Sequence, residues 1–120
     1  MREIKNVRQE RLPGRRRWFE SDALELVVWL NPREQLTGFQ LCYDRGGTER
    51  ALTWRAIGGF AHDTVDQGNA SALKNCTPIL RPDGVIPWQR LIQLFDQCSA
   101  NLEPELRAFV LAKLSEGANR

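Results

Sequence analysis

The sequence predicts an α+β fold, in which an antiparallel β-meander of three to five strands is followed by a C-terminal αα-hairpin packed on one sheet face. Three observations lead to this prediction. Apolar and polar residues alternate between Trp18 and Ala56, as they do in half-buried strands. Gly46-Gly47 interrupts the alternation as a hairpin turn would. From Pro87 onward, apolar residues recur instead at helical spacing.

Length and composition exclude several classes of protein. A chain of 120 residues has the size of one domain and can bury a core without disulfides. No apolar run approaches the ~20 residues of a membrane span, and the N-terminus lacks the apolar segment of a secretory signal. The three cysteines, Cys42, Cys76 and Cys98, lack the C-x-x-C spacing of a zinc site. We therefore expect a cytoplasmic protein without a metal, a cofactor or a membrane contact.

Charge is divided unevenly along the chain. Residues 1–17 carry a net charge of +5, whereas the remaining residues carry −3. Pro13-Gly14 stops any helix begun before it. We predict a basic N-terminal arm over residues 1–14, frayed or adaptable, and a single α+β domain over residues 15–120. Such an arm can bind a phosphate backbone, or it can lie on its own acidic body.

Three strands are predicted ahead of the Gly46-Gly47 turn, at Arg15–Glu20, Ala23–Leu30 and Leu36–Asp44. Pro32, which cannot donate to a β-ladder, lies in the loop between the last two. If the two glycines form a two-residue turn, the register of the following hairpin is set. The facing pairs are then Tyr43 with Arg50, Leu41 with Leu52 and Phe39 with Trp54, and across the preceding hairpin Val28 with Phe39 and Leu26 with Leu41.

This register divides the side chains between two faces of the sheet. The core face comprises Leu24, Leu26, Val28, Leu30, Phe39, Leu41, Tyr43, Leu52 and Trp54. The second face is mixed, and it comprises Val27, Trp29, Gly38, Gln40, Cys42, Thr53 and Arg55.

After Ala56 the alternation ends. We expect Gly58-Gly59 to be a flexible joint, and Phe60–Asn75 to be an aperiodic segment that is either functional or mobile. A short strand at Thr77–Leu80 and a turn at Pro82–Gly84 are predicted to follow.

Two helices are predicted at the C-terminal end. Trp88, Leu91, Ile92, Phe95 and Cys98 recur at helical spacing, which indicates an amphipathic helix over Pro87–Ser99. A second helix is expected to be capped by Asn101, to carry Pro104 in its first turn and to end at Gly117. The short link between them favours an antiparallel pair.

The second face is the first candidate for a binding surface. Trp29 would lie beside Gly38, where its ring has room over bare backbone, and Arg55 could stack on that ring as a cation–π pair. With Gln40 beside them, these residues could form a ligand platform or a dimer interface. The alternative is an ordinary solvated face with the N-terminal arm folded over it.

Arg16, Arg17 and Trp18 are the second candidate, because arginines beside an aromatic ring can grip phosphates and stack on a base. In a strand, Arg16 and Trp18 share one face and Arg17 points to the other, so only part of this cluster could reach one ligand. The alternative, which we favour, is that Trp18 or Phe19 anchors the arm to the sheet while the arginines solvate an edge strand.

His62, Asp63 and Asp66 are the third candidate and include the only histidine. A carboxylate could orient His62 as a base, or the three side chains could ligate a metal. The alternative, which we favour, is a polar surface loop, because no second ligand cluster accompanies this pattern.

The strings RRRWF, GFQLCYD and ERALTW, followed by TPIL, DG and two helices, resemble those of small uncharacterised bacterial proteins over nearly the whole chain. The resemblance implies a bacterial cytoplasmic protein, and it implies no activity, site residue or cofactor.

We therefore predict a small binding or accessory protein, more readily non-enzymatic than enzymatic, that acts through the second face on a protein partner or as a homodimer. The alternatives are nucleic-acid binding through the basic arm, and a small enzyme that uses His62 with Asp63 or Asp66. The sequence specifies no small-molecule ligand.

Overall fold

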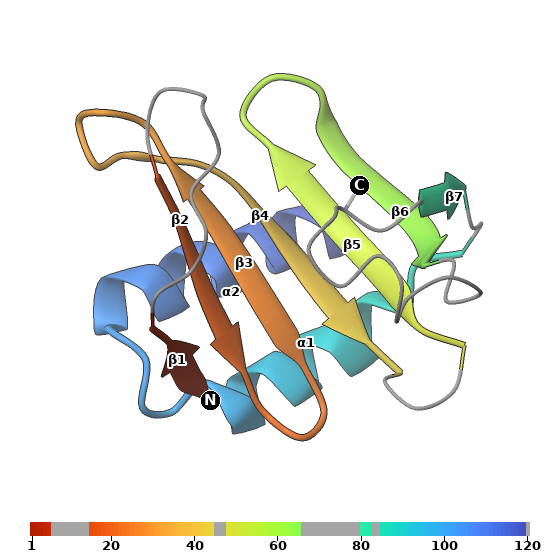
Figure 1. The fold of residues 1–120 in the computed structure, drawn as a ribbon. Coiled ribbons are helices and arrows are strands. Elements are labelled where there is room, and N and C mark those ends of the chain that lie inside the picture. Colours follow the sequence, from red (N-terminus) through yellow and green to blue (C-terminus); the bar gives the residue numbers. More distant parts are fainter. Residues whose placement is uncertain (6–14, 45–47, 66–79, 83–84, 120) are drawn as a thin grey trace, which may run out of the picture.

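The strands lie in the sheet in the same order in which they follow one another in the sequence (Figure 1). Neighbouring strands are antiparallel, and the two helices cover one face of the sheet, so the predicted α+β fold is confirmed. The computed structural model describes residues 1–5, 15–44, 48–65, 80–82 and 85–119. Its elements are β1 (Arg2–Ile4), β2 (Arg15–Glu20), β3 (Glu25–Leu30), β4 (Leu36–Tyr43), β5 (Arg50–Arg55), β6 (Gly59–Val65), β7 (Leu80–Pro82), α1 (Trp88–Cys98) and α2 (Pro104–Ala118).

The register predicted for the two central hairpins is confirmed, although Gly46-Gly47 itself lies outside the described residues. The pairs between β4 and β5 include Tyr43 with Arg50, Leu41 with Leu52 and Phe39 with Trp54, and those between β3 and β4 include Val28 with Phe39 and Leu26 with Leu41. Large apolar side chains therefore meet across the strands on one face, which is the face that the helices cover.

The predicted count of three to five strands is too low, because the described residues form seven strands. The first part of the predicted arm is one of the additional strands: β1 pairs with β2, with Ile4 opposite Trp18. Residues 6–14 lie outside the described residues. Of the short strand predicted at Thr77–Leu80, only Leu80 lies within the described residues, where it belongs to β7 and pairs with β6.

The segment Phe60–Asn75, predicted to be aperiodic, begins with a strand instead. Residues 59–65 form β6, which pairs with β5 from Gly59 to Thr64, and residues 66–75 lie outside the described residues. Phe60, His62 and Thr64 share a face with the core residues of β5. Because two of these three side chains are polar, the alternation does not resemble that of an amphipathic strand.

The Gly58-Gly59 pair, predicted to be a flexible joint, belongs to the hairpin between β5 and β6. Both glycines have positive φ angles, +110° and +75°. This left-handed backbone is one that glycine adopts without strain, so the pair allows a tight turn. The backbone N–H of Ala56 also donates to the carbonyl of Thr37 at 2.9 Å, which holds the hairpin against β4.

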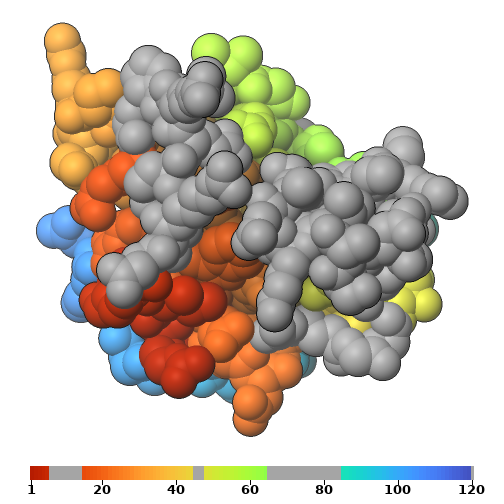
Figure 2. Space-filling view, viewed as in Figure 1, coloured from red at the N-terminus to blue at the C-terminus, as the bar shows by residue number. Residues whose placement is uncertain are grey.

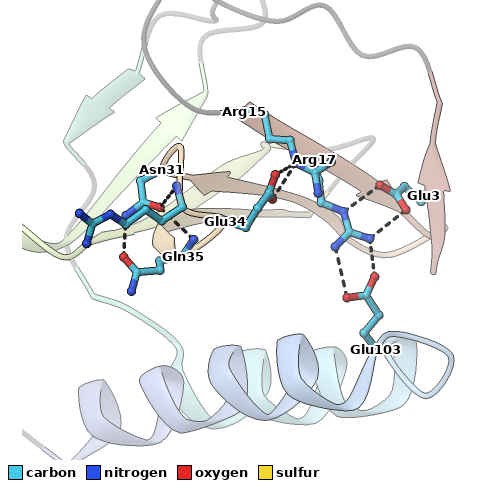
Figure 3. Close-up of polar contacts among 8 residues, drawn as sticks. Glu3, Arg15, Arg17, Asn31, Glu34, Gln35 and Glu103 are labelled. Carbon is cyan, nitrogen blue, oxygen red and sulfur yellow. Dashed lines mark hydrogen bonds and ion pairs between the residues drawn. The ribbon is translucent and has the colours of Figure 1, made fainter.

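The loop between β3 and β4 is organised around Asn31. Its side-chain oxygen accepts hydrogen bonds from the backbone N–H groups of Arg33 and Gln35, each at 2.9 Å (Figure 3). This side chain replaces the backbone partners that a tight turn lacks, as Asn does in Asx turns. Glu34 adopts a positive φ of 61° here, and its carboxylate reaches Arg15 on β2.

The core lies between the sheet and the two helices. The buried apolar side chains of this core are Phe19, Leu24, Leu26, Val28, Phe39, Leu41, Tyr43, Leu52, Leu91, Phe95, Leu102, Leu106, Val110 and Leu114. Leu30 and Trp54, also predicted for the core, are half-buried and pack against it. No helix among the described residues is long and apolar enough to cross a membrane.

Gly117, predicted to end the second helix, is instead a buried residue inside α2. A Cβ at this position would lie under 3.0 Å from three ring atoms of Trp88 on α1. The glycine therefore permits the close approach of the two helices rather than terminating one of them. Pro104 begins α2 as expected, whereas Glu103 and not Asn101 occupies the N-cap position.

Candidate binding face of the sheet

The second face of the sheet carries three rows of residues that run across the strands. At one end of the strands, Arg16, Trp29, Gly38 and Arg55 are consecutive cross-strand neighbours, and we call them the arginine row. The middle row comprises Trp18, Val27, Gln40, Thr53 and Ala61, and the row at the other end, which we call the carboxylate row, comprises Glu20, Glu25, Cys42, Ala51 and Asp63. Arg2 of β1 adjoins the carboxylate row opposite Glu20 and is ion-paired with it at 3.0 Å. The arginine row is therefore basic, whereas the other end of the second face carries charges of both signs.

Trp29 and Arg55 form the contact that the sequence predicts. The guanidinium carbon of Arg55 lies 4.3 Å from the centroid of the Trp29 ring. Gly38 lies between them in the row, and a Cβ there would be 2.7 Å from the carbonyl of Trp54 and 3.2 Å from Trp29 Cε3. The absent side chain is therefore what lets the indole lie flat on the sheet, with the exposed Arg55 above it.

The other residues of the second face are not equally exposed to solvent. Val27, Cys42 and Ala51 are buried, so they offer no contact surface. Gln40 is half-buried, and its side-chain N–H₂ donates to Thr53 Oγ1 at 3.1 Å. The reachable part centres on Arg55 and Ala61 and continues into the hairpin between β5 and β6.

Ile57 lies in that hairpin and is 92% exposed. A β-branched apolar residue is unusual at a turn, where small and polar residues prevail. The turn between β5 and β6 and the turn after β3 both project at the end of the molecule that carries the arginine row (Figure 2).

Arg16 and Trp18 both lie on the second face, as predicted for alternate residues of a strand. The guanidinium carbon of Arg16 lies 5.7 Å from the centroid of the Trp18 ring, a second arginine–tryptophan contact beside that of Arg55. The indole N–H of Trp18 is buried and has no hydrogen-bond partner among the described residues.

Arg17 points to the opposite face and is held by two carboxylates. Its guanidinium donates to Glu3 of β1, at 2.9 and 3.0 Å, and to Glu103 at the start of α2, at 2.5 and 3.3 Å (Figure 3). Its side chain is only 16% exposed. Arg17 therefore joins β1, β2 and the second helix, and we call this set of contacts the Arg17 clasp. Arg15 is likewise paired with Glu34, at 2.8 Å, on the surface.

The Arg17 clasp shifts the pKa of all three groups. The hydrogen bond from Arg17 lowers the pKa of Glu3 and that of Glu103, although burial opposes both shifts. The hydrogen bonds to Glu3 and Glu103 raise the pKa of Arg17. A depressed carboxyl pKa in the folded state means that the unfolded chain binds more protons at mildly acid pH, so acid weakens the fold through these groups.

We expect an Arg17→Met variant to be less stable at neutral pH by about 1–2 kcal/mol, because it removes the guanidinium that binds the partly buried Glu3 carboxylate and leaves only the more distant, exposed Lys5. Its loss of stability between about pH 5 and pH 3 should also be smaller than that of the wild type, since the two carboxyl pKa values return towards ordinary ones. Urea unfolding across this pH range measures both effects. Arg15→Met is the matched control, because its exposed ion pair with Glu34 contributes little. Parallel pH profiles of Arg17→Met and the wild type would contradict the role of the clasp.

His62 and Asp63 do not come together. They are consecutive residues of β6, so their side chains point to opposite faces of the sheet. His62 is buried on the helix-covered side, where its Nε2 atom is hydrogen-bonded to the hydroxyl of Tyr43. Asp63 lies on the second face, and Asp66 lies outside the described residues. Among the described residues, no group of three or more metal-ligating side chains gathers.

Tyr43, the partner of His62, has two arginines as neighbours. The guanidinium of Arg90, on α1, lies 5.6 Å from the centroid of the Tyr43 ring and is paired with Asp44. Arg50, the cross-strand neighbour of Tyr43, also contacts Asp44, at 3.5 Å. One hydrogen-bond partner of His62 is therefore a tyrosine of a neighbouring strand, which the sequence pattern alone does not indicate.

Comparisons of this chain with protein-family models, with curated proteins and with solved structures find no match. The resemblance to small bacterial proteins therefore stays a prediction, and the function is argued from the geometry alone.

Proposed function

We propose that this chain is a non-enzymatic binding protein of the bacterial cytoplasm that contacts protein partners through the second face of its sheet. The observation that carries the proposal is the stack of Arg55 on Trp29 over Gly38, at the exposed end of the arginine row. A half-buried tryptophan with an arginine over it is the combination in which protein interfaces are enriched. Cys98 is a free cysteine, in keeping with a reducing compartment.

The chemistry of this stack favours an acidic protein segment as the ligand. Because Arg55 covers the Trp29 ring, the ring face is not open for stacking by a base. A guanidinium stacked by its face keeps its N–H donors along its edge, where they can bind a carboxylate through two parallel hydrogen bonds. Arg55 has no ion-pair partner within the described part of the chain. Carboxylates of a partner protein therefore suit this site.

The other two predicted functions have less support. In the RRRW cluster, Arg15 and Arg17 are engaged by Glu34, Glu3 and Glu103, which reduces the charge available to a phosphate backbone. An acid–base role for His62 with Asp63 would require the two side chains to share a face, and they do not.

A peptide-binding measurement tests the proposal. We expect a fluorescein-labelled, glutamate-rich peptide to bind the wild type, as followed by fluorescence anisotropy, and an Arg55→Ala variant to bind it about tenfold more weakly or worse, the loss of one charge-assisted contact. Arg33→Ala is the matched control: Arg33 is exposed in the loop before β4, so it removes the same charge from the same end of the molecule without touching Trp29.

Two outcomes would overturn the proposal. If Arg33→Ala and Arg55→Ala weaken peptide binding equally, the peptide is held only by unspecific charge attraction. The second outcome is that a single-stranded oligonucleotide binds more tightly than the peptide. If that affinity falls steeply with salt but does not change in Arg55→Ala, the basic arm and not the second face is the binding site.

A further inference from the structure

The turn between β5 and β6 begins at Arg55 and is exposed along its whole length. Residues 55–58 are all exposed, and Ile57 is 92% accessible to solvent. Within the described part of the chain, Val85 is the only other large apolar side chain that is equally exposed. It belongs to the segment that leads from β7 to α1, well apart from this turn (Figure 1). An exposed apolar side chain thus lies two residues from the arginine on which the proposed function depends.

The backbone of this turn is fixed on both sides of Ile57. Arg55 pairs with Gly59 across its base, and the N–H of Ala56 donates to a carbonyl of β4 at 2.9 Å. Gly58 and Gly59 supply the two positive φ angles of the turn. The β-branched side chain of Ile57 also has few rotamers. Little conformational freedom is therefore lost when a ligand covers Ile57, so that most of the gain from its burial favours binding.

The spacing of Arg55 and Ile57 matches that of alternate residues in an extended segment. The Cα atoms of residues two apart in a chain are separated by at most about 7 Å. In an extended segment, alternate residues lie about 6.8 Å apart, and their side chains point to the same side. An extended segment laid along the turn can therefore place a carboxylate on Arg55 and an apolar side chain on Ile57 together.

We infer that the partner segment carries a large aliphatic residue two positions from the carboxylate that binds Arg55, and that Ile57 selects for this residue. The inference rests on the proposed function, because Arg55 is the anchor of the segment. A guanidinium accepts any carboxylate, whereas contact with Ile57 disfavours a segment that has a charged or small side chain at this position. Ile57 is thus the specificity-determining residue of the site.

The residue type at position 57 supports a protein partner. An aliphatic side chain offers no flat ring on which a nucleic-acid base could stack. In the free chain, its exposed apolar surface contributes nothing to stability through burial, so it becomes favourable only when a second molecule covers it.

Two fluorescein-labelled, glutamate-rich peptides of equal length and charge test the inference by fluorescence anisotropy with the full chain. One peptide has leucines two positions before and two positions after its central glutamate, so that it fits the turn in either direction. The other peptide has serines at both places. We expect the wild type to bind the leucine peptide about fivefold to tenfold more tightly than the serine peptide, since only the leucine peptide buries Ile57.

Four variants identify the origin of this preference. Ile57→Ser should bind both peptides about equally, whereas Ile57→Leu, which keeps the apolar surface, should retain the preference. Val85→Ser is the matched control: it removes an equally exposed apolar side chain elsewhere, and it should also retain the preference. Arg55→Ala should weaken the binding of both peptides.

The outcomes separate this inference from the proposed function. If the wild type binds both peptides equally and Arg55→Ala weakens both, Ile57 takes no part in recognition and the proposed function stands. A preference for leucine that survives in Ile57→Ser, or that is lost in Val85→Ser, also overturns the inference. If Arg55→Ala weakens neither peptide, the proposed function fails as well.

Sedimentation velocity on the free chain tests the other possible occupant of the turn, a second copy of this chain. We expect the wild type and Ile57→Ser to sediment alike. A dimer of the wild type that Ile57→Ser dissociates would overturn the assignment of Ile57 to a separate partner.

Discussion

Replacing Phe39 by alanine is expected to lower the free energy of unfolding by about 3–5 kcal/mol, the cost of emptying an aromatic site in a core that cannot collapse around it. Phe39 is fully buried at the centre of the sheet and faces both Val28 and Trp54. Its ring also stacks on that of Trp54, with centroids 6.0 Å apart. The variant therefore loses apolar burial and an aromatic contact together.

Chemical denaturation followed by circular dichroism measures this loss, since fluorescence would also report the altered surroundings of Trp54. Phe39→Leu is the control: it keeps most of the volume and should cost less than about 1.5 kcal/mol. Ile57→Ala, at the exposed hairpin, should change stability by no more than about 0.5 kcal/mol. A similar cost for Phe39→Ala and Ile57→Ala would show that the core lies elsewhere.

The second large effect is expected at Gly117, where alanine should destabilise the protein by about 2–3 kcal/mol. In a helix without neighbours, the same change would be stabilising by about 1 kcal/mol, because alanine is the better helix former. Here the added methyl group meets the ring of Trp88, which is itself held by an edge contact with Phe60 at 5.0 Å. The packing cost should therefore exceed the gain in helix propensity.

A double-mutant cycle with Trp88→Ala checks this explanation. In the Trp88→Ala background the clash is absent, so Gly117→Ala should become neutral or stabilising. The reversal of sign is what a packing role predicts. If Gly117→Ala destabilises both backgrounds equally, the glycine is required for its backbone and not for the approach of α1 to α2.

The pairing of the central strands could be predicted from the sequence because two independent signals agree. The alternation of Phe39 and Leu41 with polar neighbours places them on one face, and the turn at Gly46-Gly47 sets which residues they meet. A slip of one residue would place Phe39 opposite a polar residue. Trp29, Gly38 and Arg55 follow from the same register, so the centre of the candidate site could be predicted as well.

The strands at the two sides of the sheet could not be predicted, for local reasons. β1 is only three residues long and lies in a segment whose dominant signal is charge. β6 places His62 on the core side, where an apolar residue is expected, and its place is stabilised by the hydrogen bond to Tyr43. That hydrogen bond forms only because β4, β5 and β6 lie side by side, so the residues near His62 in the sequence do not predict it.

The Arg17 clasp could not be predicted because its partners are distant in sequence. Glu103 lies 86 residues from Arg17, and only the docking of α2 beneath the sheet brings them together. The arginine cluster RRRW therefore looks uniform in the sequence, yet its members divide between an ion pair on the surface, the second face and the clasp. Composition alone suggests that Arg15 and Arg17 are available to a phosphate backbone, whereas in the structure both are ion-paired with glutamates of the same chain.

The order of the strands in the sheet has a consequence for how the chain folds. Because each strand pairs with its neighbour in sequence, the sheet can grow hairpin by hairpin, and each step closes a loop of modest length. Such local pairing favours faster folding than the crossed connections of a β-sandwich. The contacts that close most of the chain at once, among them that of Arg17 with Glu103, must wait until the helices dock. The arginine row thus depends only on pairings between strands that are adjacent in the sequence, whereas the Arg17 clasp also depends on the docking of α2.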